Sequence, residues 1–260
     1  SMLNGGEALK TTVKANAKIN LFLDILDRLP NGYHSLFMIM QSVSLHDVVI
    51  IERNSCEGIR LNCSEASLPV DSKNIAYRAA ETFFEHVGVD SYGIDIHIEK
   101  NIPFEAGLAG GSADGAAVVA GLNILFDTKL SQRELCKIGL RVGSDVPFCI
   151  AGGTMLVQHT GGVISPLEPL QDCFILLAKP GSGVSTAEAY NDYDRTRCIY
   201  HPDRVKMLTS AADGDFAGMC KSAGNVFEQI IEVPERVAIK NVMHRHGAVL
   251  SQMSGSGPTV

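Results

Sequence analysis

The sequence predicts an α+β protein with two domains. Short stretches that alternate between apolar and polar residues, as half-buried strands do, are interspersed with stretches whose apolar residues recur at helical spacing. These stretches do not follow the strict strand-helix alternation of a parallel α/β sheet. A chain of 260 residues has room for two domains of ordinary size. We expect the boundary in the Gly- and Pro-rich stretch "GGVISPLEPLQ", giving domains at 1–163 and 164–260.

The strands are predicted from strict alternation. In Val13 to Ile25, odd-numbered apolar residues face one way, while Lys18 shares the other face with Asn16 and Asn20. That polar face has two readings, a solvated surface or the wall of a site. An Asn31-Gly32 turn follows this strand. Further strands are expected at 42–52, 93–100, 148–150, 153–159, 173–178 and 248–253.

The helices are predicted from apolar spacing and end signals. One covers 74–87, with Asn74 as N-cap and Gly88 as terminator. Another follows a capping box of Ser131 and Glu134 and ends at Gly143. A third, Ala116 to Leu125, is apolar on nearly all sides and must be buried. Two more are expected at 205–211 and 234–246.

The composition excludes several classes of protein. No apolar run reaches the ~18 residues of a membrane span, and the N-terminus has no secretory apolar region. With a net charge of -7 and no Lys/Arg run, binding to a nucleic acid backbone is not expected. Seven cysteines without paired spacing indicate neither structural zinc nor a disulfide framework, and favour a reducing cytoplasm. The oligomeric state stays open.

The segment "PFEAGLAGGSADGAAV", Pro103 to Val118, is the main candidate for a binding site. Its missing side chains let backbone N–H groups approach a ligand, and the helix that follows adds unpaired donors and its positive dipole end, which suits phosphate. Ser112 is a candidate N-cap, or a hydroxyl for a phosphate or a magnesium ion. Tight packing of a strand on a helix would give the same composition. No Gly-Lys dipeptide occurs, so this is not a Walker A loop.

Three motifs in order resemble the GHMP kinases: "KANAKINLFL" at 14–23, the glycine segment, and "MSGSGPTV" at 253–260. The resemblance implies a ribosomal protein S5 domain 2-like N-terminal domain and a ferredoxin-like C-terminal domain. It implies a small-molecule kinase that uses ATP and Mg²⁺, with the late glycine turn supporting the glycine segment. The ATP-binding residues implied are Pro103, Phe104, Glu105, Ala106, Gly107, Leu108, Ala109, Gly110, Gly111, Ser112 and Ala113. No metal ligand is assigned.

Further stretches at 17–36, 142–153 and 180–190 are similar to family members that phosphorylate a cytidine diphosphate sugar alcohol on the non-mevalonate route to isoprenoids. The resemblance implies Lys18 and Asp145 as catalytic residues, and it implies substrate contacts by Asn20, Tyr33, His34 and Tyr190. From the residues alone, Asp145 could equally cap backbone N–H groups, and the Tyr-His pair could belong to an ordinary hairpin. A kinase of the homoserine or mevalonate type and a catalytically silent nucleotide-binding regulator stay as alternatives.

Overall fold

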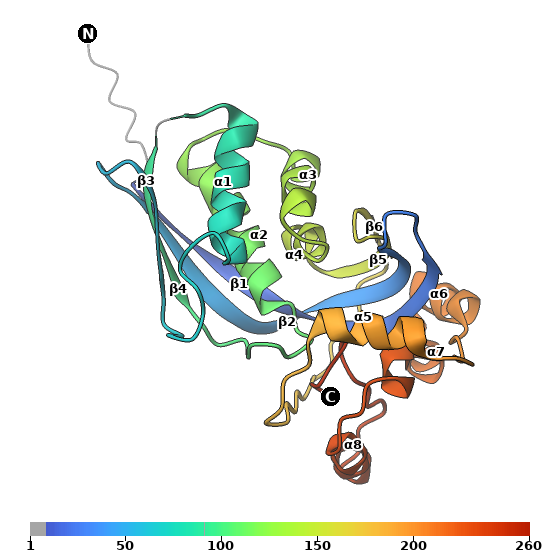
Figure 1. The fold of residues 1–260 in the computed structure, drawn as a ribbon. Coiled ribbons are helices and arrows are strands. Elements are labelled where there is room, and N and C mark those ends of the chain that lie inside the picture. Colours follow the sequence, from blue (N-terminus) through green and yellow to red (C-terminus); the bar gives the residue numbers. More distant parts are fainter. Residues whose placement is uncertain (1–8, 91) are drawn as a thin grey trace. The chain divides into compact units, whose positions relative to one another are not determined.

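The computed structural model describes residues 9–90 and 92–260 (Figure 1). The chain forms two compact units whose sequences interleave. Unit 1 combines the chain up to Ala17 with 44–102 and 110–151, and unit 2 combines 18–43, 103–109 and 152–260. The predicted domain boundary after residue 163 stays a prediction. Among the described residues, no helix is both long and apolar enough to cross a lipid bilayer.

The strands of unit 1 are the first part of β1 (Lys10–Arg28), the last part of β2 (His34–Arg53), β3 (Gly58–Cys63) and β4 (Gly93–Glu99). Strand β4 pairs antiparallel with β2, placing Ile96 opposite Ile51, and parallel with β3, placing Ile96 opposite Leu61. As predicted, Ile94, Ile96 and Ile98 are buried. Strand β3 was not expected from the sequence.

Four helices belong to unit 1: α1 (Ile75–Val87), α2 (Gly110–Leu125), α3 (Gln132–Val142) and α4 (Val146–Ala151). Figure 1 shows them on one side of the strands of this unit. The predicted caps are confirmed: the Asn74 side chain accepts from Ala76 N, Gly88 has the left-handed conformation, and Ser131 and Glu134 form the capping box. Local end signals therefore set these helix boundaries.

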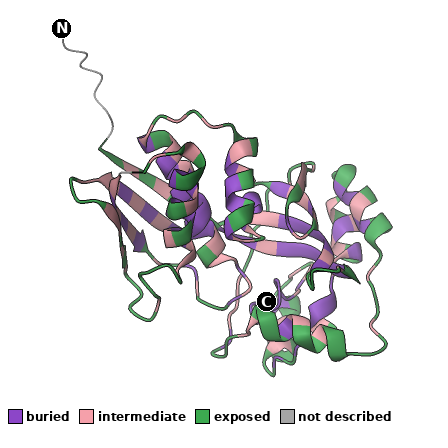
Figure 2. Cartoon of the chain, turned by 45° about the horizontal axis from the view of Figure 1, so that its top comes forward, coloured by how far each residue is buried: buried purple, intermediate pink, exposed green. Residues whose placement is uncertain are grey.

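Helix α2 is the buried helix that the sequence predicts, and Figure 2 shows buried residues along it. Its apolar residues are covered on nearly all sides, as Val118, Val119 and Leu122 are fully buried. A Cβ atom at Gly121 would lie 2.7 Å from Cδ1 of Ile51, so the Ile51 side chain would have to shift to admit one. The start of α2 is thereby held on a rigid base.

The strands of unit 2 are the last part of β1, the first part of β2, β5 (Thr154–His159), β6 (Val163–Pro166) and the short β7 (Gly224–Asn225). Strand β5 pairs antiparallel with β2 and with β6, and β7 pairs parallel with β1. The helices are α5 (Thr186–Arg195), α6 (Arg204–Ala212), α7 (Phe216–Ser222), the 3₁₀ helix η1 (Val226–Gln229) and α8 (Arg236–Arg245).

The core of unit 2 forms between its strands and helices α6 and α7. Phe22 and Phe37 meet edge to face at 5.8 Å between ring centroids, and Met207 and Met219 pack in the same cluster. Because Phe22 lies on the same strand face as Lys18 and Asn20, this face of β1 is covered from Lys18 onward. A solvated surface is therefore excluded for this part of the strand.

Four secondary-structure predictions are wrong. Residues 148–150 lie in helix α4, because Pro147 fits a first helical turn, where its missing N–H needs no partner. The expected connector contains β6, which pairs with β5. The stretches 173–178 and 248–253 do not form strands. In the first of these, Ala178 alone exchanges backbone hydrogen bonds with Val260, so the remaining residues lack the neighbouring strand that a ladder requires.

Candidate active site

Lys18 and Asn20 form a buried polar pair in unit 2. Two residues apart on β1, they project from the same face of the strand, and the Lys18 ammonium donates to Oδ1 of Asn20 at 2.7 Å. Both residues are 4% exposed. The ammonium also donates to the carbonyl oxygen of Gly107 at 3.2 Å. These bonds hold a buried positive charge beside the glycine segment.

The turn at 254–258 forms hydrogen bonds with Asn20 and with Gly107, which accepts from Lys18. The Ser254 hydroxyl donates to the Gly107 carbonyl at 2.9 Å, and the Gly255 N–H donates to Oδ1 of Asn20 at 3.1 Å. Asn225 fixes the turn by donating from its amide to the carbonyl oxygens of Met253 and Gly255. The expected contact between this turn and the glycine segment is thus present.

Gly107 occupies the most crowded position of the segment. Its φ is +76°, and a Cβ atom there would lie 2.1 Å from the carbonyl oxygen of Ser254. Positive φ values also occur at Glu105 and Ala109. Two further backbone bonds anchor the segment in unit 2: Lys18 N donates to Leu108 O, and Thr259 N donates to Ala106 O. The segment from Pro103 to Ala109 is therefore held mainly through its backbone.

In unit 1 the segment continues into the first turn of α2, whose leading N–H groups have no partner within the helix. Ser112 is the third residue of this helix, so its prediction as N-cap is wrong. Helix α2 begins at Gly110, three residues earlier than an N-cap at Ser112 would place it, directly after Ala109 with its left-handed φ of +57°. Ser112 is half-buried, and its neighbour Ala113 is buried.

Asp145 lies in unit 1 between α3 and α4. Its carbonyl oxygen accepts from Cys149 N at 3.0 Å, which places it at the start of α4, and it is partly buried. Two residues before it, a Cβ atom at Gly143 would lie 4.0 Å from the Ser112 hydroxyl, so this turn runs beside the start of α2. Lys18 belongs to unit 2. The pairing of Lys18 with Asp145 stays a prediction.

A buried cluster of three charged side chains joins the two ends of the glycine segment in unit 1. Lys100 donates to Asp114 at 2.8 Å and also to Asp47, while Asp47 accepts from the backbone of Ile102 at 2.8 Å. Asp47 is 0% and Asp114 3% exposed. Asp114 is the fifth residue of α2 and lies beyond its first turn, which holds no acidic residue; sequence reasoning missed Lys100 and Asp47. Their sequence signal is weak, because a Lys at the end of β4 and an Asp within β2 are usual surface residues.

Burial and the neighbouring charges act on the pKa values of this cluster, and both Asp114 and Lys100 have a raised pKa. Burial raises the pKa of Asp114 to about 7, with Asp47 adding to the rise and Lys100 opposing it. Burial lowers the pKa of Lys100, but Asp114 and Asp47 together outweigh burial, and the pKa is raised. In the described chain, Oδ1 of Asp114 is buried without a hydrogen-bond partner, which also disfavours its charged form.

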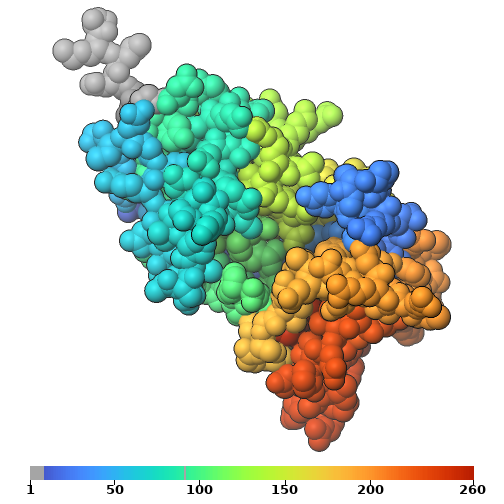
Figure 3. Space-filling view, viewed as in Figure 1, coloured from blue at the N-terminus to red at the C-terminus, as the bar shows by residue number. Residues whose placement is uncertain are grey.

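The predicted substrate residues His34 and Tyr190 meet in unit 2. Their rings stack at 5.0 Å between centroids and 19° between planes, and Tyr190 also contacts Phe227 edge to face. Tyr33, in the turn before β2, is 62% exposed. In Figure 3 this turn, in blue, lies beside the orange α5 that carries Tyr190. The exposed ring of Tyr33 thus precedes His34 in the chain, and the half-buried ring of Tyr190 stacks on His34.

The comparisons with known proteins agree on one family. The GHMP kinases N terminal domain matches residues 74–153. A 4-diphosphocytidyl-2-C-methyl-D-erythritol kinase from Clostridium tetani (strain Massachusetts / E88) is 42% identical over 95% of this chain and 89% of that protein. The kinase of the same name from Brevibacillus brevis is 44% identical, over 97% of this chain and 87% of that protein. This chain belongs to the 4-diphosphocytidyl-2-C-methyl-D-erythritol kinase family of GHMP kinases.

A solved structure supports the same conclusion for the fold. The crystal structure of a 4-(cytidine 5'-diphospho)-2C-methyl-D-erythritol kinase superposes with a TM-score of 0.73 at 28% identity, covering 96% of this chain and 88% of that one. The predicted α+β GHMP kinase fold is therefore confirmed. The family also supplies the general chemistry, because GHMP kinases use ATP and a small-molecule substrate.

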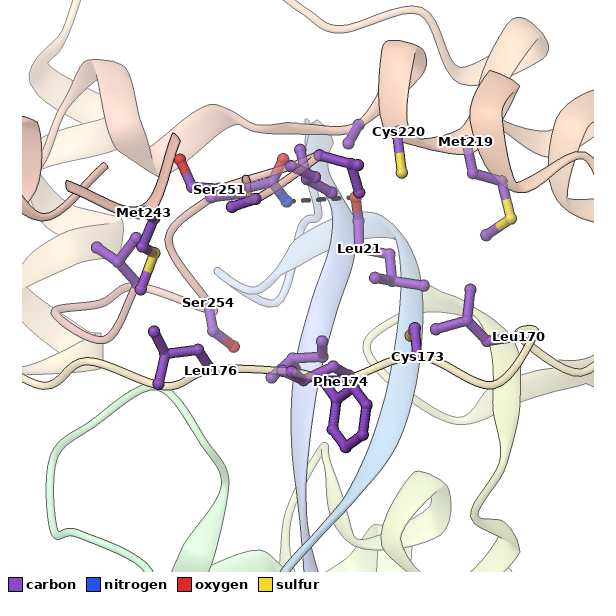
Figure 4. A pocket seen from close by; sticks show the side chains of 18 of the residues that line it. Leu21, Leu170, Cys173, Phe174, Leu176, Met219, Cys220, Met243, Ser251 and Ser254 are labelled. Atoms are coloured by element: carbon purple, nitrogen blue, oxygen red, sulfur yellow. Dashed lines mark hydrogen bonds between the residues drawn. The ribbon is translucent and has the colours of Figure 1, made fainter. Parts of the chain in front are cut away.

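A cavity in unit 2 of this family member is distinct from the predicted reaction site. It has a volume of about 450 Å³ in unit 2, and Figure 4 shows Leu176, Phe174 and Met243 among its lining side chains. Of the predicted site residues in the described chain, only Asn20 lines it. Its lining is mostly apolar and includes no Asp, Glu, Lys or Arg, so it lacks the charged groups expected for phosphoryl transfer.

Proposed function

We propose that this chain is an ATP-dependent kinase that phosphorylates the 2-hydroxyl of 4-diphosphocytidyl-2-C-methyl-D-erythritol, on the non-mevalonate route to isoprenoids. The observation that carries the proposal is the buried Lys18–Asn20 pair, hydrogen-bonded to the glycine segment and to the 254–258 turn. The names of the relatives supply the substrate.

In the proposed reaction, the oxygen of the substrate's 2-hydroxyl attacks the γ-phosphorus of ATP while Asp145 takes the hydroxyl proton. The bond between the γ-phosphorus and the bridging oxygen breaks, ADP leaves with the electron pair, and the product carries a phosphate monoester. Lys18 offsets the negative charge on the transferring group. Backbone N–H groups of the glycine segment and of the first turn of α2 bind the ATP phosphates. Tyr33, His34 and Tyr190 bind the cytosine.

Magnesium enters this reaction with ATP. Among residues 9–90 and 92–260, no group of three or more His, Cys, Asp and Glu side chains could hold a metal ion by itself. Mg²⁺ commonly keeps water and substrate phosphates as ligands and takes few from the protein, so the phosphates of ATP are its expected ligands here. Cytoplasmic placement is part of the same proposal and is supported by the absence of disulfides among the cysteines.

The decisive experiment offers three alcohols in parallel and measures ATP consumption. We expect turnover with cytidine-diphosphate methylerythritol and none with homoserine or mevalonate. Turnover with either of the other two would overturn the substrate assignment. ATP binding without turnover of any of the three would favour the silent regulator instead.

A further inference from the structure

One face of helix α5 encloses the His34 side chain. Tyr190, Tyr193 and Asp194 are spaced at i, i+3 and i+4, so they share a helix face. Tyr190 stacks on the imidazole, Tyr193 meets it edge to face at 5.7 Å, and Asp194 Oδ1 lies 2.7 Å from His34 Nε2. The His34 side chain is 7% exposed. Three contacts from one helix therefore fix the orientation of this ring.

The contact with Asp194 decides which ring nitrogen carries a proton. An ionised carboxylate only accepts hydrogen bonds, so Nε2 of His34 must be the donor in this pair. The other oxygen of Asp194 lies 3.5 Å from the guanidinium of Arg28. In the described chain, Nδ1 of His34 has no hydrogen-bond partner. In a neutral imidazole protonated at Nε2, Nδ1 is an acceptor.

We propose that Asp194 is a positioning residue that holds His34 with its proton on Nε2, so that Nδ1 accepts from the 4-amino group of the substrate's cytosine. This rests on the proposed function, which supplies the cytosine. Uracil carries a carbonyl oxygen at position 4 instead of the amino group. Nδ1 of His34 and this oxygen would both be acceptors, so no hydrogen bond could form between them. Asp194 therefore contributes to the selection of cytosine over uracil although it need not touch the base.

Calorimetric titration of the full chain with cytidine 5'-diphosphate (CDP) and uridine 5'-diphosphate (UDP) tests the proposal. We expect Asp194→Ala to weaken CDP binding about three- to tenfold, the worth of one ordinary hydrogen bond, and to leave UDP binding nearly unchanged. Asp194→Asn keeps an oxygen that accepts from Nε2 and should retain most of the preference. The control is Asp192→Ala, on the same helix but with a side chain 53% exposed.

Two further readouts separate positioning from general damage. In turnover assays Asp194→Ala should raise the KM for the cytidine substrate and leave kcat and the KM for ATP nearly unchanged. In ¹⁵N NMR spectra of the imidazole, His34 should be protonated at Nε2 in the unaltered chain and should become a tautomer mixture in Asp194→Ala. Combining His34→Ala with Asp194→Ala should weaken CDP binding no more than His34→Ala does alone.

Three outcomes would contradict the positioning role of Asp194 alone, and a fourth would also contradict the proposed function. CDP binding that is unchanged in Asp194→Ala, or an unaltered chain that binds CDP and UDP equally, would contradict the positioning role while leaving the kinase proposal standing. A loss in Asp194→Asn as large as in Asp194→Ala would show that charge matters rather than the tautomer, and would also overturn it. An unaltered chain that binds no CDP would contradict the proposed function as well.

Discussion

At the scale of single residues, the site depends on the buried ammonium group of Lys18, which hydrogen bonds from neighbouring residues stabilise in place of water. Taking a charge out of water costs several kcal/mol unless partners replace the water. Lys18 has such partners in Asn20 and the Gly107 carbonyl, and Asn20 is itself held by Gly255. The ammonium is therefore fixed before any substrate arrives, as electrostatic stabilisation of a transition state requires.

Asp145 is the residue whose replacement tests the proposed chemistry most directly. Asp145→Asn keeps the size of the side chain and removes its ability to take a proton. We expect kcat to fall by roughly 10² to 10⁴ while ATP binding stays nearly intact. Steady-state kinetics and nucleotide titration measure the two effects separately. The control is Asp172→Asn at an exposed position, and near-normal turnover of Asp145→Asn would remove Asp145 from the mechanism.

Tyr33 tests the binding of the base without risk to the fold, because its side chain is 62% exposed. We expect Tyr33→Ala to weaken CDP binding by about 1 to 3 kcal/mol, the worth of one base–aromatic stack, and to leave the melting temperature unchanged. Tyr33→Phe keeps the ring and should bind normally. Equal affinity of Tyr33→Ala and the unaltered chain would exclude a stacking role.

The sequence predicts much of this site at the residue scale and misses part of it for physical reasons. Alternation on β1 placed Lys18 and Asn20 on one face, and the structure confirms this. Burial of that face depends on the 254–258 turn, more than two hundred residues away, and no local pattern reveals that contact. Asp194 was missed because helix α5 was not predicted, although its spacing from Tyr190 is helical.

At the scale of elements, the caps at Asn74 and Ser131 were predicted correctly, whereas some apolar stretches were wrongly expected to form strands. Caps such as Asn74 act within one turn, so the sequence contains the whole interaction. A strand also needs a neighbour. The apolar stretches 173–178 and 248–253 have strand composition, yet they do not form strands in this structure. Residues 148–150 were misassigned for a related reason, because a short apolar run fits a buried helix as well as a strand.

Gly107 links the glycine segment to the late turn and gives a prediction at this scale. In Gly107→Ala the new Cβ atom would meet the Ser254 carbonyl at 2.1 Å in a backbone conformation that disfavours side chains. We expect a loss of more than about 2 kcal/mol in the free energy of unfolding, measured by urea denaturation, with a loss of activity.

Gly214→Ala is the matched control for this experiment. Gly214 has a similar φ of +66°, but a Cβ atom there would meet nothing within 4 Å. Gly214→Ala should therefore cost only the backbone strain, about 1 kcal/mol. If both variants lose the same stability, the contact between the glycine segment and the turn contributes nothing measurable.

At the scale of the whole molecule, the Asp47–Lys100–Asp114 cluster makes stability depend on pH. Burial raises the pKa of Asp114 from its ordinary 3.8 to about 7. Between these values the folded state holds a proton that the unfolded state has lost. This stabilising contribution is complete below pH 4 and is lost as the pH rises through 7, at no more than about 1.4 kcal/mol per pH unit.

Asp114→Asn tests this prediction, because its amide is a neutral side chain of the same shape that still accepts from Lys100. We expect the unaltered chain to lose unfolding free energy relative to Asp114→Asn as the pH rises from 5 to 8, in urea denaturation at several pH values. Subtracting the two curves cancels the other titrating groups, including the exposed carboxylates. Asp127→Asn, whose side chain is 80% exposed, should show no such relative change. Parallel curves for the unaltered chain and Asp114→Asn would mean that Asp114 is ionised throughout this range. The cluster, with two carboxylates and one ammonium group, would then carry one net negative charge, and that charge would not change with pH over this range.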